Sequence, residues 1–537
     1  MKIVEGNLID IENREIYPCA ITISEGKIVS MERNSNSYDC YISPGLIDSH
    51  VHVESSMLTP TEFSKLALLN GTVAVVADPH EIANVMGEEG IRFMMEDAKN
   101  TALKFFWGIP SCVPATPFDR GGAVLNADVV ENLAKTGRFS HLSEMMNVPG
   151  VLNGDEEVLR KLETAKEHKL RIDGHSPALR GEDLSRYIAR GVETDHESVT
   201  LEEAQEKISK GMHVQIREGS AARNYEALKS LIATDTDRIM FCTDDSHSED
   251  LLQKGHINKI VKKAIADGFG IFDILQVACL NPVRFYHLDV GTLREGDAAD
   301  FILVDDIDTF NVLSVYVNGD EVFREGEEVK TMLREGVSLN NFVHDSISLD
   351  ELRLPVQGTV PCIQIVPDSL ITDKRQLEFA ARIENFQSSL DDDILKIAYV
   401  NRYFNGKPQL GLISGANLKR GAFATSVAHD SHNIIAMGTN DADLADAINI
   451  VIENKGGLVL SCRGESYSLP LPIGGIMSDK TGKEVAERYL FLLDKLKEWG
   501  CSLRAPFMTL SFMSLIVIPA LKIGEEGLFD VEAFKFV

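Results

Sequence analysis

Eight short apolar runs, each ending in polar or ionisable residues, are the feature that most constrains the fold of this chain. All eight lie between residues 44 and 289, and helical patterns such as DEEVLRKLETAKEHK separate them. The runs are GLIDSHVHV, TVAVVADPH, KFFWGIPSC, FSHLSEMM, LRIDGHS, VETDHES, HVQIREG and RIMFCTDD. A (β/α)8 barrel requires eight strand–helix units in about 250 residues. We therefore expect an α/β fold with a TIM-like barrel over residues 44–289.

Different sequence textures flank the barrel on both sides. Residues 1–43 and 290–345 alternate apolar and polar positions around Gly and Asn, as in KIVEGNLIDI and VLSVYVNGDEVFREG, which predicts short strands. We expect these two segments to build one small composite β-sandwich. Residues 346–537 carry strand-like runs, including CIQIV, NIIAMG and GGLVLSC, and a helical segment in DKTGKEVAERYLFLLDKLKEWG. They predict a C-terminal α/β or α+β domain.

His50 and His52 alternate within the first apolar run, in the stretch PGLIDSHVHVESS. With 14 histidines among 537 residues, such a pair arises by chance in roughly one chain in three, so the pair alone is weak support for a metal site. Residues two apart on a strand share a face, and the carboxyl ends of barrel strands form the active site. We therefore expect both imidazoles to project into the mouth of the barrel.

Later strand ends supply further side chains that can bind metal, namely Glu144, His175, His196 and Asp244. Each histidine taken alone can equally be a hydrogen-bonded core or surface residue, but their shared position at successive strand ends favours a metal site. Four imidazoles and two carboxylates suit divalent zinc, iron or manganese. Six protein ligands exceed what one catalytic metal with an open position needs, so we expect two metals bridged by a carboxylate.

The charge balance disfavours some classes of partner. Lys and Arg number 53 against 82 Asp and Glu, a formal charge of −29, which argues against nucleic acid and anionic membrane surfaces. The apolar stretch 507–521 is short for a membrane span, and Ser511, Ser514 and Pro519 interrupt it. Eight scattered cysteines without a C-x-x-C pair, and an N-terminus without a basic-then-apolar leader, predict reduced thiols in a cytoplasmic protein.

The stretch PGLIDSHVH, the later single histidines and Asp244 resemble the amidohydrolase superfamily of metal-dependent hydrolases over residues 1–330, including the split sandwich around the barrel. Within that superfamily the chain is similar to the adenine deaminase family. Longer phrases carry this resemblance: VADPHEIANV, SEMMNVPGV and DGHSPALRG in the barrel, and VAHDSHNIIAMGTNDADLADAIN and PLPIGGIMS in the C-terminal domain. The resemblance therefore extends over nearly the whole chain.

Two departures from other branches of the superfamily support this choice. Many binuclear members bridge their metals with a carboxylated lysine at the end of strand four, where this chain has Glu144 and no lysine. Mononuclear deaminases place a glutamate three residues after the strand-five histidine, where this chain has Ala178. The residue that protonates the substrate must then lie elsewhere.

The resemblance implies hydrolysis of adenine to hypoxanthine and ammonia, a purine salvage reaction. It implies two divalent ions, Mn(II) or Fe(II), whereas the ligands alone leave Zn(II) plausible. Association into a homo-oligomer, such as a dimer, is also implied. Two alternatives remain open. One is a related amidohydrolase that acts on an N6-substituted adenine or a cyclic amide. The other is a metal-free scaffold or binding protein, which predicts missing ligands, and none is missing here.

Catalytic roles follow from the resemblance and from position at the barrel mouth. We expect Asp244 to ligate one metal, to take the proton of the attacking hydroxide and to deliver it to the departing amine. Attack at C6 loads charge onto N1 of the purine, which needs a positioned acid. Glu81, Glu197 and Glu218 are the candidates, and each can instead be an exposed loop carboxylate.

Other polar residues near the strand ends are candidates for contact with the substrate, namely His80, Glu81, Arg217, Ser220, Asp245 and His429. Each has a plain alternative. Arg217 can form a salt bridge, and Asp245 can orient a neighbour or hold a loop by a hydrogen bond. His429, in the C-terminal stretch AHDSHN, either belongs to a turn that satisfies its own backbone or reaches the barrel mouth and covers the base.

Overall fold

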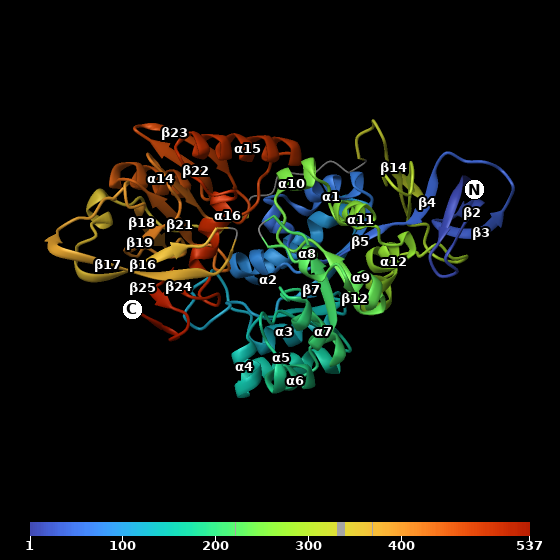
Figure 1. Cartoon of the computed structure of the whole chain (residues 1–537), viewed down its shortest axis with the longest axis horizontal. Helices are drawn as coiled ribbons and strands as arrows, with labels where there is room; N and C mark the ends of the chain where they lie inside the picture. The colour runs from blue at the N-terminus through green and yellow to red at the C-terminus, as the bar shows by residue number, and fades with distance from the viewer. Residues whose placement is uncertain (221, 330–338, 368) are drawn as a thin grey trace.

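Eight parallel strands, in a five-stranded sheet (β5–β9) and a three-stranded sheet (β10–β12), form the barrel of the computed structural model, which describes residues 1–220, 222–329, 339–367 and 369–537. The barrel lies at the centre of the molecule (Figure 1). The strands are β5 (Leu46–Val51), β6 (Thr72–Ala77), β7 (Lys104–Ile109), β8 (His141–Met145), β9 (Arg171–Gly174), β10 (Thr194–Asp195), β11 (His213–Arg217) and β12 (Ile239–Cys242). A parallel bridge between Val51 and Asp244 joins the last strand to the first, and Glu193 N donates to Ile172 O at 2.9 Å between β9 and β10. Each strand lies within one of the eight apolar runs, so the predicted (β/α)8 barrel is confirmed.

Helices connect the barrel strands and cover them. They are α1 (Pro60–Leu69), α2 (His80–Asp97), α3 (Ala127–Lys135), α4 (Val148–Asn153), α5 (Glu156–Glu167), α6 (Gly181–Ala189), α7 (Leu201–Ser209), α8 (Tyr225–Leu228), α9 (Leu231–Thr234), α10 (Ser248–Gln253), α11 (Ile257–Ala266), α12 (Ile271–Leu275) and α13 (Asn281–Tyr286). Helix α5 shows why such segments form. The Asp155 side chain caps its first turn by accepting from Val158 N, and Val158, Leu162 and Ala165 recur at helical spacing on the buried face.

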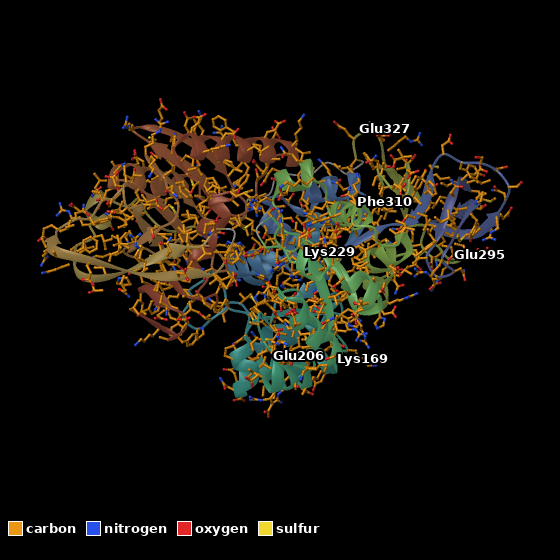
Figure 2. The ribbon with its side chains drawn as sticks, in the orientation of Figure 1. Lys169, Glu206, Lys229, Glu295, Phe310 and Glu327 are labelled. Atoms are coloured by element: carbon orange, nitrogen blue, oxygen red, sulfur yellow. The ribbon has the colours of Figure 1, made fainter. Side chains whose placement is uncertain are left out.

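Segments from both sides of the barrel pair in one seven-stranded sheet, in the order β15-β14-β13-β4-β1-β2-β3. The strands are β1 (Lys2–Asp10), β2 (Glu15–Ser24), β3 (Lys27–Arg33), β4 (Tyr41–Pro44), β13 (Phe301–Val304), β14 (Val312–Val317) and β15 (Asp320–Arg324). Strands β4 and β13 join the two segments in antiparallel register, with Ile302 opposite Ser43. Phe310 is fully buried and belongs to the same hydrophobic cluster as the barrel core, so it attaches this sheet to the barrel (Figure 2).

The C-terminal unit is built on an eight-stranded sheet, in the order β17-β16-β19-β18-β21-β20-β22-β23. Its strands are β16 (Val356–Ile365), β17 (Thr372–Ile383), β18 (Ile394–Val400), β19 (Gln409–Ser414), β20 (Ala422–Thr425), β21 (Ile434–Gly438), β22 (Gly457–Cys462) and β23 (Glu465–Pro470). Helix α14 (Asp441–Glu453) covers one face. Helices α15 (Gly482–Glu498) and α16 (Pro506–Ser511) and strands β24 (Leu521–Gly524), β25 (Gly527–Asp530) and β26 (Lys535–Phe536) complete the unit.

The composite sheet, the barrel and the C-terminal unit follow one another along the long axis of the molecule (Figure 1). Helix α15 packs against α1 and α10 of the barrel, and Ser478 N donates to Met57 O at 2.8 Å. The loop between β20 and β21 also reaches the barrel, where Asn433 Nδ2 donates to Arg120 O at 3.1 Å. Among the helices of the described residues, none has the combination of length and apolar character that crossing a membrane requires.

Candidate metal-dependent active site

The six predicted metal ligands lie together at the carboxyl end of the barrel. His50 is on β5 and Glu144 on β8, and the other four, His52, His175, His196 and Asp244, follow directly or within two residues of the ends of β5, β9, β10 and β12. All strands of a parallel barrel open at one end, so side chains at their ends converge. Five of the six residues are at least 96% buried, and the side chain of His175 is 17% exposed.

Glu144 faces two histidine groups with its two carboxylate oxygens. Its Oε2 lies 2.8 Å from His175 Nδ1 and 3.1 Å from His196 Nε2. Its Oε1 lies 3.4 Å from His52 Nε2. A carboxylate with His175 and His196 at one oxygen and His52 at the other has the geometry of a bridging ligand.

Asp244 stands on the opposite side of His52. Its Oδ1 lies 3.1 Å from His52 Nε2 and 3.5 Å from His50 Nε2. The buried His50 Nε2 forms no hydrogen bond within the part of the chain that the structure describes. A buried imidazole nitrogen without a partner is costly in a dry core, but its lone pair is free to bind a metal.

The ligand atoms group into sets that fit two ions. His50, His196 and Asp244 form one set, and Glu144, His175 and His196 form another, each with its ligand atoms within 4.8 Å of one another. His52 and Glu144 also share a set with Asp78 and His80. The mixed nitrogen and oxygen donors and the shared Glu144 are therefore compatible with a binuclear metal centre.

Electrostatics keep the carboxylates in their ligand form. Burial disfavours ionisation of Glu144, but the imidazoles of His175, His196 and His52 outweigh it and hold its pKa well below the usual range. Burial, and then the nearby His196, lower the pKa of His50, so its imidazole is neutral at pH 7. Metals bind deprotonated carboxylates and neutral imidazoles, so both groups are ready to coordinate.

Arg217 ties two acidic residues of the site together. Its Nη1 donates to both Glu197 and Asp244, and its Nη2 lies 3.3 Å from Glu197 Oε2. Burial opposes ionisation of Asp244, yet the Arg217 guanidinium and the histidines hold its pKa well below the usual range. Glu197 Oε1 in turn lies 3.4 Å from His196 Nε2 and 3.6 Å from His175 Nδ1. Arg217 thus fixes the orientation of carboxylates on both sides of the metal-ligand cluster.

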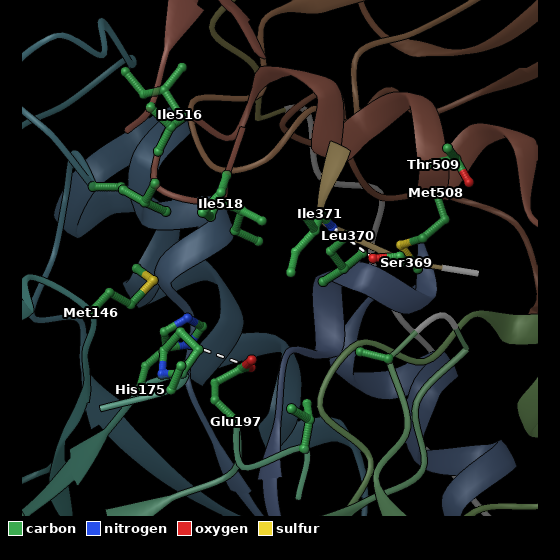
Figure 3. A pocket seen from close by; sticks show the side chains of 18 of the residues that line it. Met146, His175, Glu197, Ser369, Leu370, Ile371, Met508, Thr509, Ile516 and Ile518 are labelled. Carbon is green, nitrogen blue, oxygen red and sulfur yellow. Dashed lines mark hydrogen bonds and ion pairs between the residues drawn. The ribbon is translucent and has the colours of Figure 1, made fainter. Parts of the chain in front are cut away.

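A cavity of about 920 Å³ opens onto this cluster. His175, Glu197 and Arg217 contribute polar groups to its lining, and Figure 3 shows His175 and Glu197 facing each other at one side. Most of the remaining lining is apolar and comes from the barrel loops and the C-terminal unit, including Met146, Leu179, Leu370, Ile371, Met508 and Ile518. The C-terminal unit therefore forms part of the wall that faces the candidate metal centre.

Other predicted residues have their polar groups directed to protein partners. Glu218 Oε2 lies 3.4 Å from Lys263 Nζ, and Ser220 Oγ donates to Asp250 Oδ2 at 2.8 Å. Asp245 Oδ1 accepts from Ser55 Oγ at 2.5 Å. Glu218 and Ser220 therefore face Lys263 and Asp250. Asp245 forms one set of ligand-distance atoms with His52 and Asp244.

The structure also brings Asp78 to the site, a residue not among the predicted ones, and it places His432 of the stretch AHDSHN beside Glu81. Asp78 directly follows β6, its backbone oxygen lies 3.1 Å from His52 Nδ1, and its Oδ2 lies 2.9 Å from His80 Nδ1. A backbone acceptor on Nδ1 leaves Nε2 of His52 to face Glu144 and Asp244, two of the predicted ligands. The position of Asp78 in the stretch ADPHE, directly after a buried strand, was a signal by which the sequence could have identified it. The stretch AHDSHN marked the loop of His432 as one that can reach the barrel mouth, but its contact with Glu81 was not predicted.

The fold and the site together define an amidohydrolase. The profile described as "Amidohydrolase family" matches residues 41–322, and the one described as "Adenine deaminase C-terminal domain" matches residues 369–535.

Curated relatives match over the full length. The adenine deaminase of Methanosarcina acetivorans is 47% identical over 549 residues, covering 100% of this chain and 99% of that protein. That of Sulfurovum sp. is 47% identical and that of Borreliella burgdorferi 44%, each covering 99% of both chains. The chain belongs to the adenine deaminase family, as the resemblance predicted.

Proposed function

We propose that this protein hydrolyses adenine to hypoxanthine and ammonia at the candidate metal centre of the barrel. The observation that carries the proposal is the placement of Glu144, whose two oxygens face two histidine groups. Relatives named adenine deaminase that match the whole chain at 43–47% identity support the choice of substrate.

Two divalent ions would be held by the six ligands, with His50, His52 and Asp244 on one side, His175 and His196 on the other, and Glu144 between them. When bound, such ions lower the pKa of water and so supply a nucleophile at neutral pH. We propose Mn(II) or Fe(II) as the native metals, with Zn(II) also compatible with imidazole and carboxylate donors.

Asp244 is proposed to take a proton from the nucleophile and to pass it to the departing amine. Its Oδ2 accepts from Arg217, and its Oδ1 lies beside His52. A carboxylate paired with a guanidinium is a weak base, so it releases an accepted proton readily. Arg217 would hold the carboxylate in one orientation through both proton transfers.

Glu197 is our choice for the acid at the purine ring. Of the three glutamates that sequence position leaves unranked, Glu197 alone lines the cavity among the described residues. Glu218 faces Lys263, and both oxygens of Glu81 contact histidines, away from the cavity. Burial raises the pKa of Glu197, but Arg217 and the nearby histidines outweigh it and lower that pKa, so Glu197 would act as the acid after it gains a proton during the reaction. Arg217 also lines the cavity and remains a proposed substrate contact. Substrate roles for His80, Ser220, Asp245 and His429 stay predictions.

We divide the chain into a composite β-sandwich of residues 1–43 and 290–345, a barrel of residues 44–289 and a C-terminal domain of residues 346–537. The seven-stranded sheet that joins β4 to β13 supports the composite unit. A homodimer and a cytoplasmic location are further predictions.

A second candidate substrate is an adenine that carries a substituent on N6. A cavity of about 920 Å³ lies near the upper end of the range for pockets that enclose drug-sized ligands, so it leaves room beyond a purine base. The larger leaving amine would contact the apolar wall, and the chemistry at C6 would be unchanged.

The decisive experiment measures ammonia release from adenine by chelated protein and by protein reloaded with Mn(II), Fe(II) or Zn(II). We expect activity only in the reloaded samples, and a loss of at least about 100-fold in His196→Ala, since a metal ligand is removed. His168→Ala, which changes a histidine at the end of α5, serves as the control and should retain full activity. Adenosine, dihydroorotate and N6-methyladenine test the rival substrates. Failure to release ammonia from adenine with every metal would contradict the proposal.

A further inference from the structure

A second cluster of ionisable side chains joins the C-terminal unit to the barrel beside the candidate metal centre. Glu81, in the first turn of α2, lies between His429 and His432 of the loop that connects β20 and β21. Its Oε1 lies 2.7 Å from His429 Nδ1, and its Oε2 contacts His432 Nε2. The three residues are 1%, 4% and 1% exposed, so water does not compete for these contacts.

Local contacts hold both imidazoles against Glu81, and for His432 they fix the ring as a hydrogen-bond donor. Ala428 N donates to His432 Nδ1 at 3.3 Å, so the ring hydrogen of a neutral His432 lies on Nε2, which faces the carboxylate. Burial lowers the pKa of His432 to about 4, which keeps that ring neutral. The His429 ring stacks on Phe512, with centroids 4.4 Å apart and planes 15° apart. Neither ring can turn away from Glu81 without losing these contacts.

The cluster is continuous with the metal ligands through His80. Glu81 Oε1 lies 3.6 Å from His80 Nε2. His80 Nδ1 lies 2.9 Å from Asp78 Oδ2 and 3.5 Å from Glu144 Oε1. A chain of buried polar contacts therefore runs from the C-terminal loop through Glu81 and His80 to the carboxylate between the two histidine groups.

We propose that His429 and His432 are positioning residues for the reaction. They hold Glu81 through both carboxylate oxygens, and Glu81 in turn places His80 against Glu144. Through this contact the C-terminal unit sets the geometry of the metal ligands as well as walling the cavity. The inference rests on the proposed function for its kinetic readout, but its spectroscopic readout does not depend on the substrate.

A third metal ion bound by Glu81, His429 and His432 is the alternative to a positioning role for the two histidines. The ligand atoms of Glu81, His429 and His432 lie within 4.8 Å of one another, as those of a metal site would. Coordination through Nε2 of His432 requires the hydrogen on Nδ1, the atom that accepts from Ala428 N. This hydrogen bond therefore favours a proton between His432 and Glu81 over a third ion.

The test compares His432→Leu with His432→Gln in enzyme loaded with Co(II), whose visible absorption reports ligand geometry. Leucine removes the donor, whereas the amide of glutamine can replace the Nε2 hydrogen bond. We expect His432→Leu to lower kcat by about 10- to 100-fold, the usual effect of losing a residue that orients a ligand. KM should change far less, and the Co(II) spectrum should shift. His432→Gln should recover most of the wild-type kcat and of the wild-type Co(II) spectrum.

His344→Leu is the matched control, because His344 is also buried in the C-terminal unit and hydrogen-bonds to the backbone oxygens of Asp345 and Gly406. It should leave kcat and the Co(II) spectrum unchanged. Glu81→Gln should reproduce the effect of His432→Leu, and replaces that variant if it fails to fold.

Three results separate the possibilities. A wild-type kcat and Co(II) spectrum in His432→Leu and in Glu81→Gln would overturn the positioning role. A third metal equivalent in the wild type that His432→Leu loses would overturn it in favour of a metal site. If no metal form deaminates adenine, the proposed function fails, while a spectral shift in His432→Leu with two bound ions would still support the positioning role.

Discussion

Two buried lysines of this molecule differ in whether a carboxylate lies beside them. Lys207 and Asp195, both fully buried, lie 2.9 Å apart, and Lys207 holds the pKa of Asp195 at about 2 against the effect of burial. This pair supports the loop that carries His196. Lys522 is different, because it is fully buried and donates to the neutral Leu370 O at 2.8 Å.

The first prediction concerns the pH dependence of stability that Lys522 causes. Burial lowers its pKa to about 7, whereas an unfolded lysine titrates near about 10.4. Between these values the unfolded chain binds more protons, so the free energy of unfolding rises with pH by up to about 1.4 kcal/mol per unit. Lys522→Met removes this dependence. Its stability relative to the wild type should therefore fall as the pH is raised from 7 to 9.

Urea unfolding at pH 7, 8 and 9 measures the effect, with Lys535→Met, at an exposed position, as the control. Parallel pH profiles for the wild type and Lys522→Met would contradict the prediction.

The second prediction concerns Glu144. In Glu144→Gln the neutral amide offers one oxygen in place of two anionic ones, so it cannot bridge two cations. We expect the bound metal to fall below two equivalents and deamination to drop by at least about 100-fold. Elemental analysis and ammonia release measure the two effects together. Glu163→Gln, at an exposed position of α5, is the control, and full metal content in Glu144→Gln would refute the bridging role.

Single elements show how local sequence signals act within the larger fold. The eight apolar runs became the eight barrel strands because alternation and turn chemistry are local. Helix α15 was likewise predicted from its periodicity, and its first turn is closed by a capping box between Thr481 and Glu484. That this helix packs against α1 and α10 of the barrel was not predictable from the helix alone.

The third prediction tests this capping box. Thr481→Ala removes the acceptor for Glu484 N and the partner of the Glu484 carboxylate. A cap of this kind contributes about 1 kcal/mol, so the free energy of unfolding should fall by that amount. Chemical denaturation is the measurement. Lys483→Ala, an exposed change in the same turn, is expected to be near neutral, and an equal loss in both variants would argue against the cap.

At the scale of the whole molecule, the barrel and the C-terminal unit share one hydrophobic core. A single hydrophobic cluster runs from barrel residues such as Leu46 and Phe241 to C-terminal residues such as Ile397 and Phe423. The cavity and the Glu81 contacts lie where these units meet. The net charge of −29 does not oppose divalent cations at the barrel mouth.

The fourth prediction follows from this shared core. Removing the metals should lower the melting temperature, because ions that bind the folded state stabilise it by mass action. The barrel and the C-terminal unit should still unfold together, in one calorimetric transition. Reloading with Mn(II) should restore the melting temperature, with chelator already saturated by metal as the control. Separate transitions for the two units would contradict the shared core.

The sequence predicted the candidate ligands at the strand ends, but it did not predict the contacts that depend on loop geometry. His50, His52, Glu144, His175, His196 and Asp244 were predicted because each follows a strand pattern, and a barrel brings strand ends together wherever they lie in the sequence. Arg217 and Glu197 were found as candidates, but their pairing with each other and with Asp244 depends on loop geometry. Asp78 was missed although its position directly after a strand made it visible.

The sequence by itself determined the alternation of strands and helices, the candidate ligands at the strand ends and the family, because these depend on local spacing and on motifs. Only the tertiary structure decided what the other acidic residues do. Glu81 and His432 are 351 positions apart, and no periodicity links them. Their contact arises because the shared hydrophobic core docks the C-terminal unit on the barrel, which leaves Glu197 at the cavity and turns Glu81 toward the histidines of the other unit.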